Sequence, residues 1–121
     1  MMGGFGVRVE ELDGGIRALS ISGELDQATV PELESRLDEV ITGDGNALLV
    51  DLSSCEFIDS SGLASLVAAH ERMSANGGRR FALCCPESQV KRLLELTGLD
   101  EAIGLAGSRD EALAHLGANS S

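Results

Sequence analysis

The sequence has almost no aromatic residues and few basic ones. Among 121 residues there is no Trp or Tyr, and three Phe are the whole aromatic set. Proteins that bind single-stranded nucleic acids stack bases on exposed aromatic side chains, so this composition argues against that activity. Lys and Arg number 9 against 20 Asp and Glu, a net charge of −11. Such a chain repels phosphate backbones and anionic lipids, so we expect no direct nucleic-acid partner and no membrane partner. The acidity is explained either by a protein partner that carries a basic patch or by a need for solubility alone.

Long apolar runs and cysteine patterns are also missing. No run approaches the roughly 18 apolar residues of a membrane-spanning helix, and the first residues lack the pattern of a secretory signal. Three cysteines (Cys55, Cys84 and Cys85) are an odd number without metal-ligand spacing, so we expect a cytoplasmic protein with reduced thiols and no metal. Adjacent Cys84 and Cys85 should point to opposite faces of a strand, one of them into the core. A strained disulfide between them, acting as a redox switch, is the alternative.

Motifs of enzymes and cofactor sites are absent as well. The sequence contains neither Gly-x-Gly-x-x-Gly nor Gly-x-x-x-x-Gly-Lys, so no loop is expected to hold NAD or ATP. His70 and His115 fall in predicted helices without an acid–base partner in the sequence. The alternative is an acidic pocket for Mg²⁺ made by Asp26, Asp51 and Asp59 at strand ends. We favour a chain that is not an enzyme and has no cofactor of its own.

The chain alternates between strand-like and helix-like patterns. Such alternation predicts an α/β fold with a mixed, mostly parallel sheet of four to five strands, about four helices and an N-terminal hairpin. One domain should span 1–121, with an ordered core of about 5–117 and frayed ends, including Gly117–Ser121. The strands are expected at Phe5–Leu12, Ile16–Gly23, Ala47–Leu52, Phe81–Cys84 and, at best, Ala102–Leu105.

Turn and cap signals place the helices between these strands. The residues Asp13, Gly14 and Gly15 predict the hairpin turn, and Thr29 to Glu32 form a capping-box pattern. The helices should begin near Val30, after Gly62, at Pro86 and at Ser108, with Gly98 in a left-handed cap and Leu99 folding back toward Leu94. Their expected apolar positions are Val30, Leu33, Leu37, Val40 and Ile41 in the first and Val90, Leu93, Leu94 and Leu96 in the third.

The most informative residues are Asp59, Ser60, Ser61 and Gly62. They stand between an apolar strand and an amphipathic helix, where free N–H groups at the helix start favour an anion. A serine there can cap the helix, or it can carry a phosphate that the helix dipole stabilises. Local sequence leaves both readings open.

Three stretches in this order resemble one family. They are Gly23 to Asp26, Phe57 to Leu63 and Val90 to Leu99. Together they are similar to the STAS-domain anti-sigma factor antagonists of bacterial sigma-factor control, over roughly Val7 to Leu116. The resemblance implies a STAS-like fold and a partner switch. In it the unphosphorylated antagonist binds an anti-sigma factor, which is also a GHKL-type serine kinase, and so frees a sigma factor.

The same resemblance assigns roles to individual residues. It implies that the kinase phosphorylates Ser60, that this switches binding off, and that a PP2C-type phosphatase resets the switch. ATP and Mg²⁺ would belong to those partners. Asp26, Asp59, Ser61 and Gly62 are the expected partner-binding residues, with helix capping the alternative for Asp59 and a solvated turn the alternative for Asp26. Gly62 is expected to let a partner backbone approach.

Some features depart from the family or leave its role open. Gln27 and Ala28 replace polar or His residues common after the loop acid, which could alter partner choice. The protein should be a monomer or weak dimer. A scaffold subunit of a stressosome or transport complex is the alternative function for the same fold.

Overall fold

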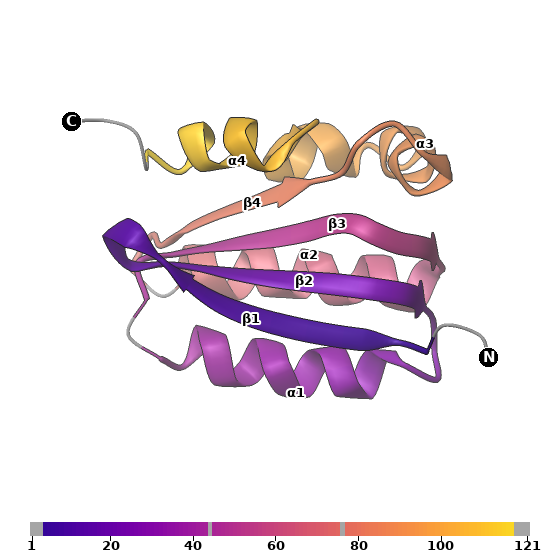
Figure 1. The fold of residues 1–121 in the computed structure, drawn as a ribbon, viewed down its shortest axis with the longest axis horizontal. Helices are drawn as coiled ribbons and strands as arrows, with labels where there is room; N and C mark the ends of the chain where they lie inside the picture. Colours follow the sequence, from indigo (N-terminus) through magenta and orange to yellow (C-terminus); the bar gives the residue numbers. More distant parts are fainter. Residues whose placement is uncertain (1–3, 44, 76, 118–121) are drawn as a thin grey trace.

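A five-stranded sheet forms the centre of the protein, and helices cover it (Figure 1). The computed structural model describes residues 4–43, 45–75 and 77–117. The strands lie side by side in chain order: β1 (Gly6–Leu12), β2 (Ile16–Leu25), β3 (Ala47–Ile58), β4 (Arg80–Cys84) and β5 (Leu105–Ala106). The helices are α1 (Val30–Ile41), α2 (Ser60–Ala75), α3 (Gln89–Leu96) and α4 (Arg109–His115). The predicted α/β fold, with four long helices, is confirmed.

The first two strands form the expected hairpin. β1 is antiparallel to β2, and every later neighbour is parallel. The connecting turn η1 (Asp13–Gly15) needs two residues with positive φ, which Gly14 (80°) and Gly15 (77°) supply. Fraying was expected over Gly117–Ser121. Of these residues only Gly117 is described, and residues 118–121 lie outside the described part of the chain.

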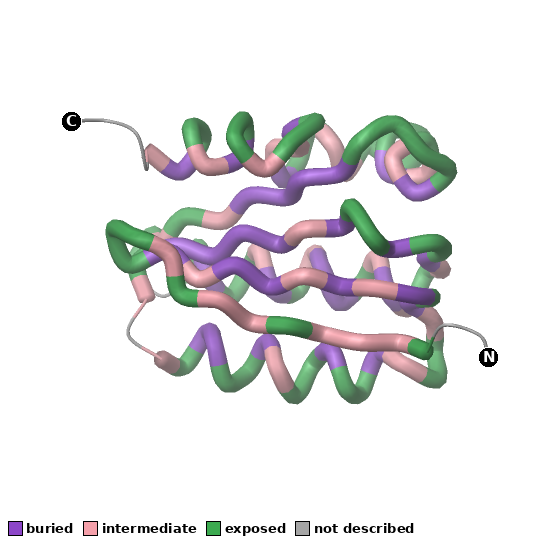
Figure 2. The backbone as a smooth tube through the Cα atoms, in the orientation of Figure 1, coloured by how far each residue is buried: buried purple, intermediate pink, exposed green. Residues whose placement is uncertain are grey.

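The sheet separates two apolar clusters. On one face, α1, α2 and α3 pack against the sheet through residues such as Leu33, Leu66 and Leu94. On the other face, α4 adds Ala112 and Leu116 to a smaller cluster. Figure 2 shows purple, buried segments along the central strands, with exposed segments on the outer sides of the helices. The five apolar positions predicted for α1 are all buried.

A single arginine ties α4 to three strands. The guanidinium of Arg109 donates to Asp51 on β3 (3.0 and 3.2 Å), to Glu10 on β1 (3.1 Å) and to Ser20 on β2 (3.2 Å). Partial burial alone would raise the pKa of Asp51, but hydrogen bonds from Ser53, Cys84 and Arg109 outweigh burial and hold that pKa below its ordinary value. No local pattern predicts this network, because its members are up to 99 residues apart.

Two strand predictions were wrong in extent. The third strand was expected to end at Leu52 but runs to Ile58, because β2 continues to pair with it past two irregularities in register. One of them is at Gly23, whose φ is +88° and where a Cβ would lie 2.8 Å from the carbonyl oxygen of Gly4. The last strand was expected at Ala102–Leu105, but residues Asp100–Gly104 form a π-helical turn, η2, and β5 follows it.

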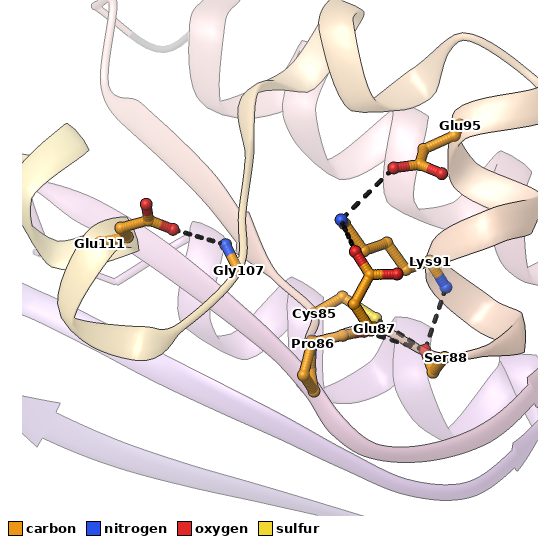
Figure 3. Close-up of polar contacts among 8 residues, drawn as sticks. All are labelled: Cys85, Pro86, Glu87, Ser88, Lys91, Glu95, Gly107 and Glu111. Atoms are coloured by element: carbon orange, nitrogen blue, oxygen red, sulfur yellow. Dashed lines mark hydrogen bonds and ion pairs between the residues drawn. The ribbon is translucent and has the colours of Figure 1, made fainter.

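Two helix starts and one cap differ from prediction. The second helix was expected after Gly62 but begins at Ser60, whereas α1 begins at Val30 as expected. Thr29 does not cap α1: its backbone is already helical and its hydroxyl donates to the carbonyl of Glu24 at 2.8 Å. The third helix begins at Gln89 rather than at Pro86, because the Oγ of Ser88 accepts from the N–H of Lys91 at 3.1 Å and so sets the helix start (Figure 3). Figure 3 also shows the expected start of α4, where Glu111 accepts from the N–H of Gly107.

The predicted apolar face of α3 was partly wrong. Val90 and Leu94 are buried, but the side chain of Leu96 is 78% exposed. Positions 90 and 94 are about one turn apart, whereas position 96 lies roughly 120° around the helix from position 90 and roughly 160° from position 94. Gly98 has the expected positive φ of 79°, and Leu99 packs against the cluster that contains Leu94.

The three cysteines are free and buried. Cys84 and Cys85 belong to the clusters on opposite faces of the sheet, so the prediction of opposite faces is confirmed. Only one of the two was expected in a core, but both are buried in one. Burial raises the pKa of the Cys55 thiol to about 11 and, together with the nearby charge of Asp51, that of Cys84 to about 12. Thiols of this kind are poor nucleophiles. In the described part of the chain, no helix is long and apolar enough to cross a membrane.

Candidate functional site

Residues Asp59 to Gly62 lie at the junction of β3 and α2, beside the end of β2. Leu25 and Ile58 are the last register pair of the two strands. The N–H of Asp59 donates to the carbonyl of Leu25 at 3.1 Å, which fixes the start of the helix against the neighbouring strand. Because β2 and β3 are parallel, the loops after them leave the sheet at the same edge. The structure thus brings the Asp26 loop next to the start of α2.

Asp59, not Ser60, caps α2. Its Oδ1 accepts from the N–H of Gly62 at 3.1 Å, the bond that an N-cap residue makes to the third helical position. Its Oδ2 accepts from the N–H of Gln27 at 3.3 Å. One carboxylate therefore holds both the helix start and the loop after β2, and it keeps the two at a fixed separation.

Ser60 occupies the first helical position and is exposed to solvent. Among the residues that the structure describes, its hydroxyl has no hydrogen-bond partner. The cap reading of this serine is therefore wrong, since Asp59 already performs that task. An exposed hydroxyl on a fixed helix start is accessible to a modifying enzyme, and a negative charge there is favoured by the helix dipole.

Asp26 organises the turn between β2 and α1. Its Oδ1 accepts from the N–H groups of Ala28 (3.0 Å) and Thr29 (3.2 Å), an Asx-type turn. The turn role weighed from the sequence is thus present, and the partner-binding role stays a prediction. Asp26, Gln27, Ala28 and Asp59 together line an open hollow at this end of the molecule. Neither acid forms an ion pair with any described residue.

Gly62 faces the interior of the protein. A Cβ at this position would lie 2.8 Å from both Ile58 Cγ1 and Leu25 Cγ, closer than real Cβ contacts. This packing gives a reason for glycine inside the protein itself, and approach by a partner backbone stays a prediction. Ser61, the residue before Gly62, is half-buried.

Phe57 is an apolar feature of the site to which the sequence analysis gave no role. Its side chain is 47% exposed, although its neighbour Ile58 is buried. Strand alternation does not predict this exposure, because Cys55, two residues earlier, is buried and the exposed pair Glu56 and Phe57 interrupts the period of two. Phe57 therefore offers an aromatic contact at the same end of the sheet as the acidic loop and Ser60.

The alternative of an acidic metal pocket was wrong. Asp26 and Asp59 meet at one end of the sheet, but Asp51 lies eight residues back along β3, roughly 25 Å at 3.3 Å per residue, and binds Arg109. Within the described residues, no group of three His, Cys, Asp or Glu side chains could hold a metal ion.

Comparison with known proteins identifies the family. The model of the STAS domain matches residues 8–112. The chain belongs to the STAS-domain family. This STAS-domain protein is 35% identical over 99 residues to the anti-sigma-F factor antagonist RsfB of Mycobacterium tuberculosis, with 82% of this chain and 80% of that protein covered. It is 31% identical over 83 residues to an anti-sigma-B factor antagonist of Staphylococcus aureus, with 69% and 76% covered.

A solved structure agrees with the sequence relatives. An anti-sigma factor antagonist from Mycobacterium paratuberculosis matches this STAS-domain protein with a TM-score of 0.85 at 34% identity, and 93% of this chain and 94% of that chain are covered. The resemblance to STAS-domain anti-sigma factor antagonists and the STAS-like fold are both confirmed. Gln27 and Ala28 line the hollow beside Asp59.

Proposed function

We propose that this protein is an anti-sigma factor antagonist whose binding is switched by phosphorylation of Ser60. The unphosphorylated form binds an anti-sigma factor and frees a sigma factor, and the phosphorylated form does not bind. The observation that carries the proposal is the exposed Ser60 hydroxyl at the first position of α2, left without a capping task because Asp59 performs it. The relatives named above support the antagonist role, since their names place them in the same control system.

The partner surface follows from the residues around Ser60. Phe57 gives an apolar contact, and Asp26 and Asp59 give negative charge on rigid elements. Aromatic side chains at the centre of an interface often dominate its binding energy. An anti-sigma factor with a basic patch would match the two acids and would associate faster at low ionic strength.

Phosphorylation would act through charge and desolvation rather than by refolding. A phosphate adds about −1.5 to −2 charges, here beside two carboxylates. In the free protein it would be solvated and would lie at the positive end of α2. In the complex it would lose water or face like charge, which can cost several kcal/mol. Because about 1.4 kcal/mol changes affinity tenfold, such a cost is enough to abolish binding.

The enzymes of the switch would be supplied by the partners. We infer a GHKL-type kinase, identical with the anti-sigma factor, that brings ATP and Mg²⁺, and a PP2C-type phosphatase that removes the phosphate. The chain itself would act by binding, without turnover or a cofactor.

A capture and phosphorylation experiment tests the proposal. Ser60→Ala and Ser60→Asp proteins serve as baits in lysate of the source cell, and the captured kinase is then incubated with ATP and wild-type protein. We expect the Ala bait alone to retain a GHKL-type ATPase, and phosphopeptide mapping to find the phosphate on Ser60. Equal capture by both baits would contradict the proposal and favour a scaffold role. Phosphate on Ser61 instead would contradict the assignment of the switch to Ser60.

A further inference from the structure

A groove runs between α1 and α2 on the side of the helices that faces away from the sheet. Its floor is apolar and consists of Leu37 and Ile41 from α1 and Ala68 and Ala69 from α2. The small side chains of α2 leave a hollow of about 440 Å³ there. We call this feature, with that floor, the α1–α2 groove. Its volume is large enough for one or two side chains of another protein.

Two polar bridges connect the helices across the α1–α2 groove. The hydroxyl of Ser65, a buried residue, donates to Oε2 of Glu34 at 3.1 Å. Toward the other end, Arg72 pairs with Asp38 at 3.0 Å. The bridges fix the spacing of the helices, so the hollow between them is present before any partner binds. A preformed hollow lowers the ordering cost of association.

The charge around the α1–α2 groove indicates the chemistry of an occupant. The exposed side of α1 carries Glu32 and Glu34 in addition to Asp38 and Glu39. Asp38 and Glu39 already pair with arginines, whereas Glu32 and Glu34 form no ion pair among the described residues. An occupant with a Lys or Arg beside an aliphatic side chain would match both the acids and the apolar floor.

The α1–α2 groove starts close to the proposed switch. Ser65 is five residues after Ser60 on the same helix, about 7.5 Å along its axis. A protein docked on Phe57 and Ser60 can therefore reach the groove with a short segment. A phosphate on Ser60 would be close to the near end of the groove and roughly 18 Å from Arg72 at its far end, beyond the screening length of physiological salt.

We propose that the anti-sigma factor places a segment with an aliphatic side chain and a Lys or Arg in the α1–α2 groove, with the cation on Glu34. This inference rests on the proposed function, because it extends the same interface. The groove contact supplies affinity that phosphorylation of Ser60 leaves in place. The phosphate would still switch binding off, because the groove contact alone would leave only a residual affinity, too weak to free the sigma factor.

Filling the α1–α2 groove tests the proposal. Ala68 is exposed, so Ala68→Trp fills the hollow without disturbing a core. Ala114→Trp is the matched control, because Ala114 is an exposed alanine on α4, across the sheet. With the purified anti-sigma factor captured by the Ser60→Ala bait, we expect Ala68→Trp to weaken binding at least tenfold and Ala114→Trp to change it less than twofold. Unchanged binding by Ala68→Trp would overturn the groove contact.

A second pair of variants tests the charge. Glu34→Gln keeps an acceptor for Ser65 and removes the negative charge, and Glu101→Gln is the control at an exposed acid of η2. We expect a several-fold loss for Glu34→Gln and a shallower salt dependence of binding, with neither change for Glu101→Gln. Equal salt dependence in both variants would contradict the proposed cation on Glu34.

The outcomes separate this inference from the proposed function. If Ser60→Asp loses the anti-sigma factor while Ala68→Trp and Glu34→Gln bind normally, the switch stands and the groove contact is wrong. If Ser60→Asp binds like wild type, the switch itself fails. The molar mass of the free protein adds a further check: a dimer that Ala68→Trp dissociates would make a second copy of the chain the occupant and would also overturn the proposal.

Discussion

At Gly62, packing decides whether a substitution raises or lowers the free energy of unfolding. The change is Gly62→Ala, at the third position of α2. Helix propensity alone would make alanine stabilising by about 0.8–1 kcal/mol. The structure predicts the opposite, because the new Cβ would lie 2.8 Å from Leu25 Cγ and from Ile58 Cγ1, and 3.0 Å from Leu25 Cδ2.

The size of the effect follows from the cost of overpacking. An extra methyl group in a well-packed core costs typically 1–3 kcal/mol. After the propensity gain is subtracted, we expect the free energy of unfolding to fall by up to about 2 kcal/mol. For domains between 60 and 250 residues, each 1 kcal/mol shifts the melting temperature by roughly 2–8 °C. The variant should therefore melt several degrees below wild type.

The assay is thermal and urea unfolding followed by circular dichroism, with Ala64→Gly as the matched control. Ala64 is an exposed position one half-turn further along α2. There the exchange of alanine for glycine should lower the free energy of unfolding by about 1 kcal/mol, through the difference in helix propensity alone. If Gly62→Ala proved more stable than wild type, the close packing of α2 on Leu25 and Ile58 would be refuted.

Three further predictions concern the cap, the α4 network and the thiols. Asp59→Ala should lower the free energy of unfolding by about 0.5–2 kcal/mol through loss of the N-cap. In a urea titration Asp59→Asn should lie between Asp59→Ala and wild type, because its single amide oxygen can keep the cap but loses the bond from Gln27. Arg109→Met should cost about 1–3 kcal/mol at pH 7, because Asp51 keeps its charge without its cation. The folded state lowers the pKa of Asp51, so its stabilisation is complete above the ordinary Asp pKa of about 3.9 and lost as the pH falls below it. The wild-type advantage in unfolding experiments should accordingly shrink below about pH 4, and a constant difference down to pH 3 would contradict the network. At pH 8, Ellman's reagent should titrate three thiols in denaturant and react slowly with the native protein; rapid reaction of the native form would contradict the burial and raised pKa values.

Elements with strong local signals could be predicted from the sequence. The hairpin follows from Asp13, Gly14 and Gly15, and α1 from apolar residues at helical spacing. The end of β3 could not be predicted, because residues 53–58 are mostly polar or exposed and are held as a strand by pairing with β2. Likewise, Leu105 and Ala106 form a strand only because they pair with β4. Pairing between distant segments is not encoded in local composition.

The same distinction applies to the site. The motif at residues 59–62 marked the right junction, but the identity of the cap depended on a single carboxylate oxygen. Local preference allows Asp59 or Ser60 as N-cap, and the strand bond from Asp59 to Leu25 selects Asp59. Contacts between elements had no local signal. Ser65 and Glu34, for example, are 31 residues apart in the sequence.

A negative charge at Ser60 is proposed to prevent binding, and an affinity measurement shows whether it does. Wild type, Ser60→Ala, Ser60→Asp and Ser74→Asp proteins are titrated with the purified anti-sigma factor by calorimetry. Aspartate at the first helical position is compatible with α2, so loss of binding by Ser60→Asp would not reflect unfolding, and melting curves check this. Ser74→Asp adds the same charge at an exposed serine about 21 Å along the same helix. We expect tight binding by wild type, Ser60→Ala and Ser74→Asp, and binding at least 100-fold weaker for Ser60→Asp. Equal affinity of Ser60→Asp and Ser60→Ala would contradict the proposed switch.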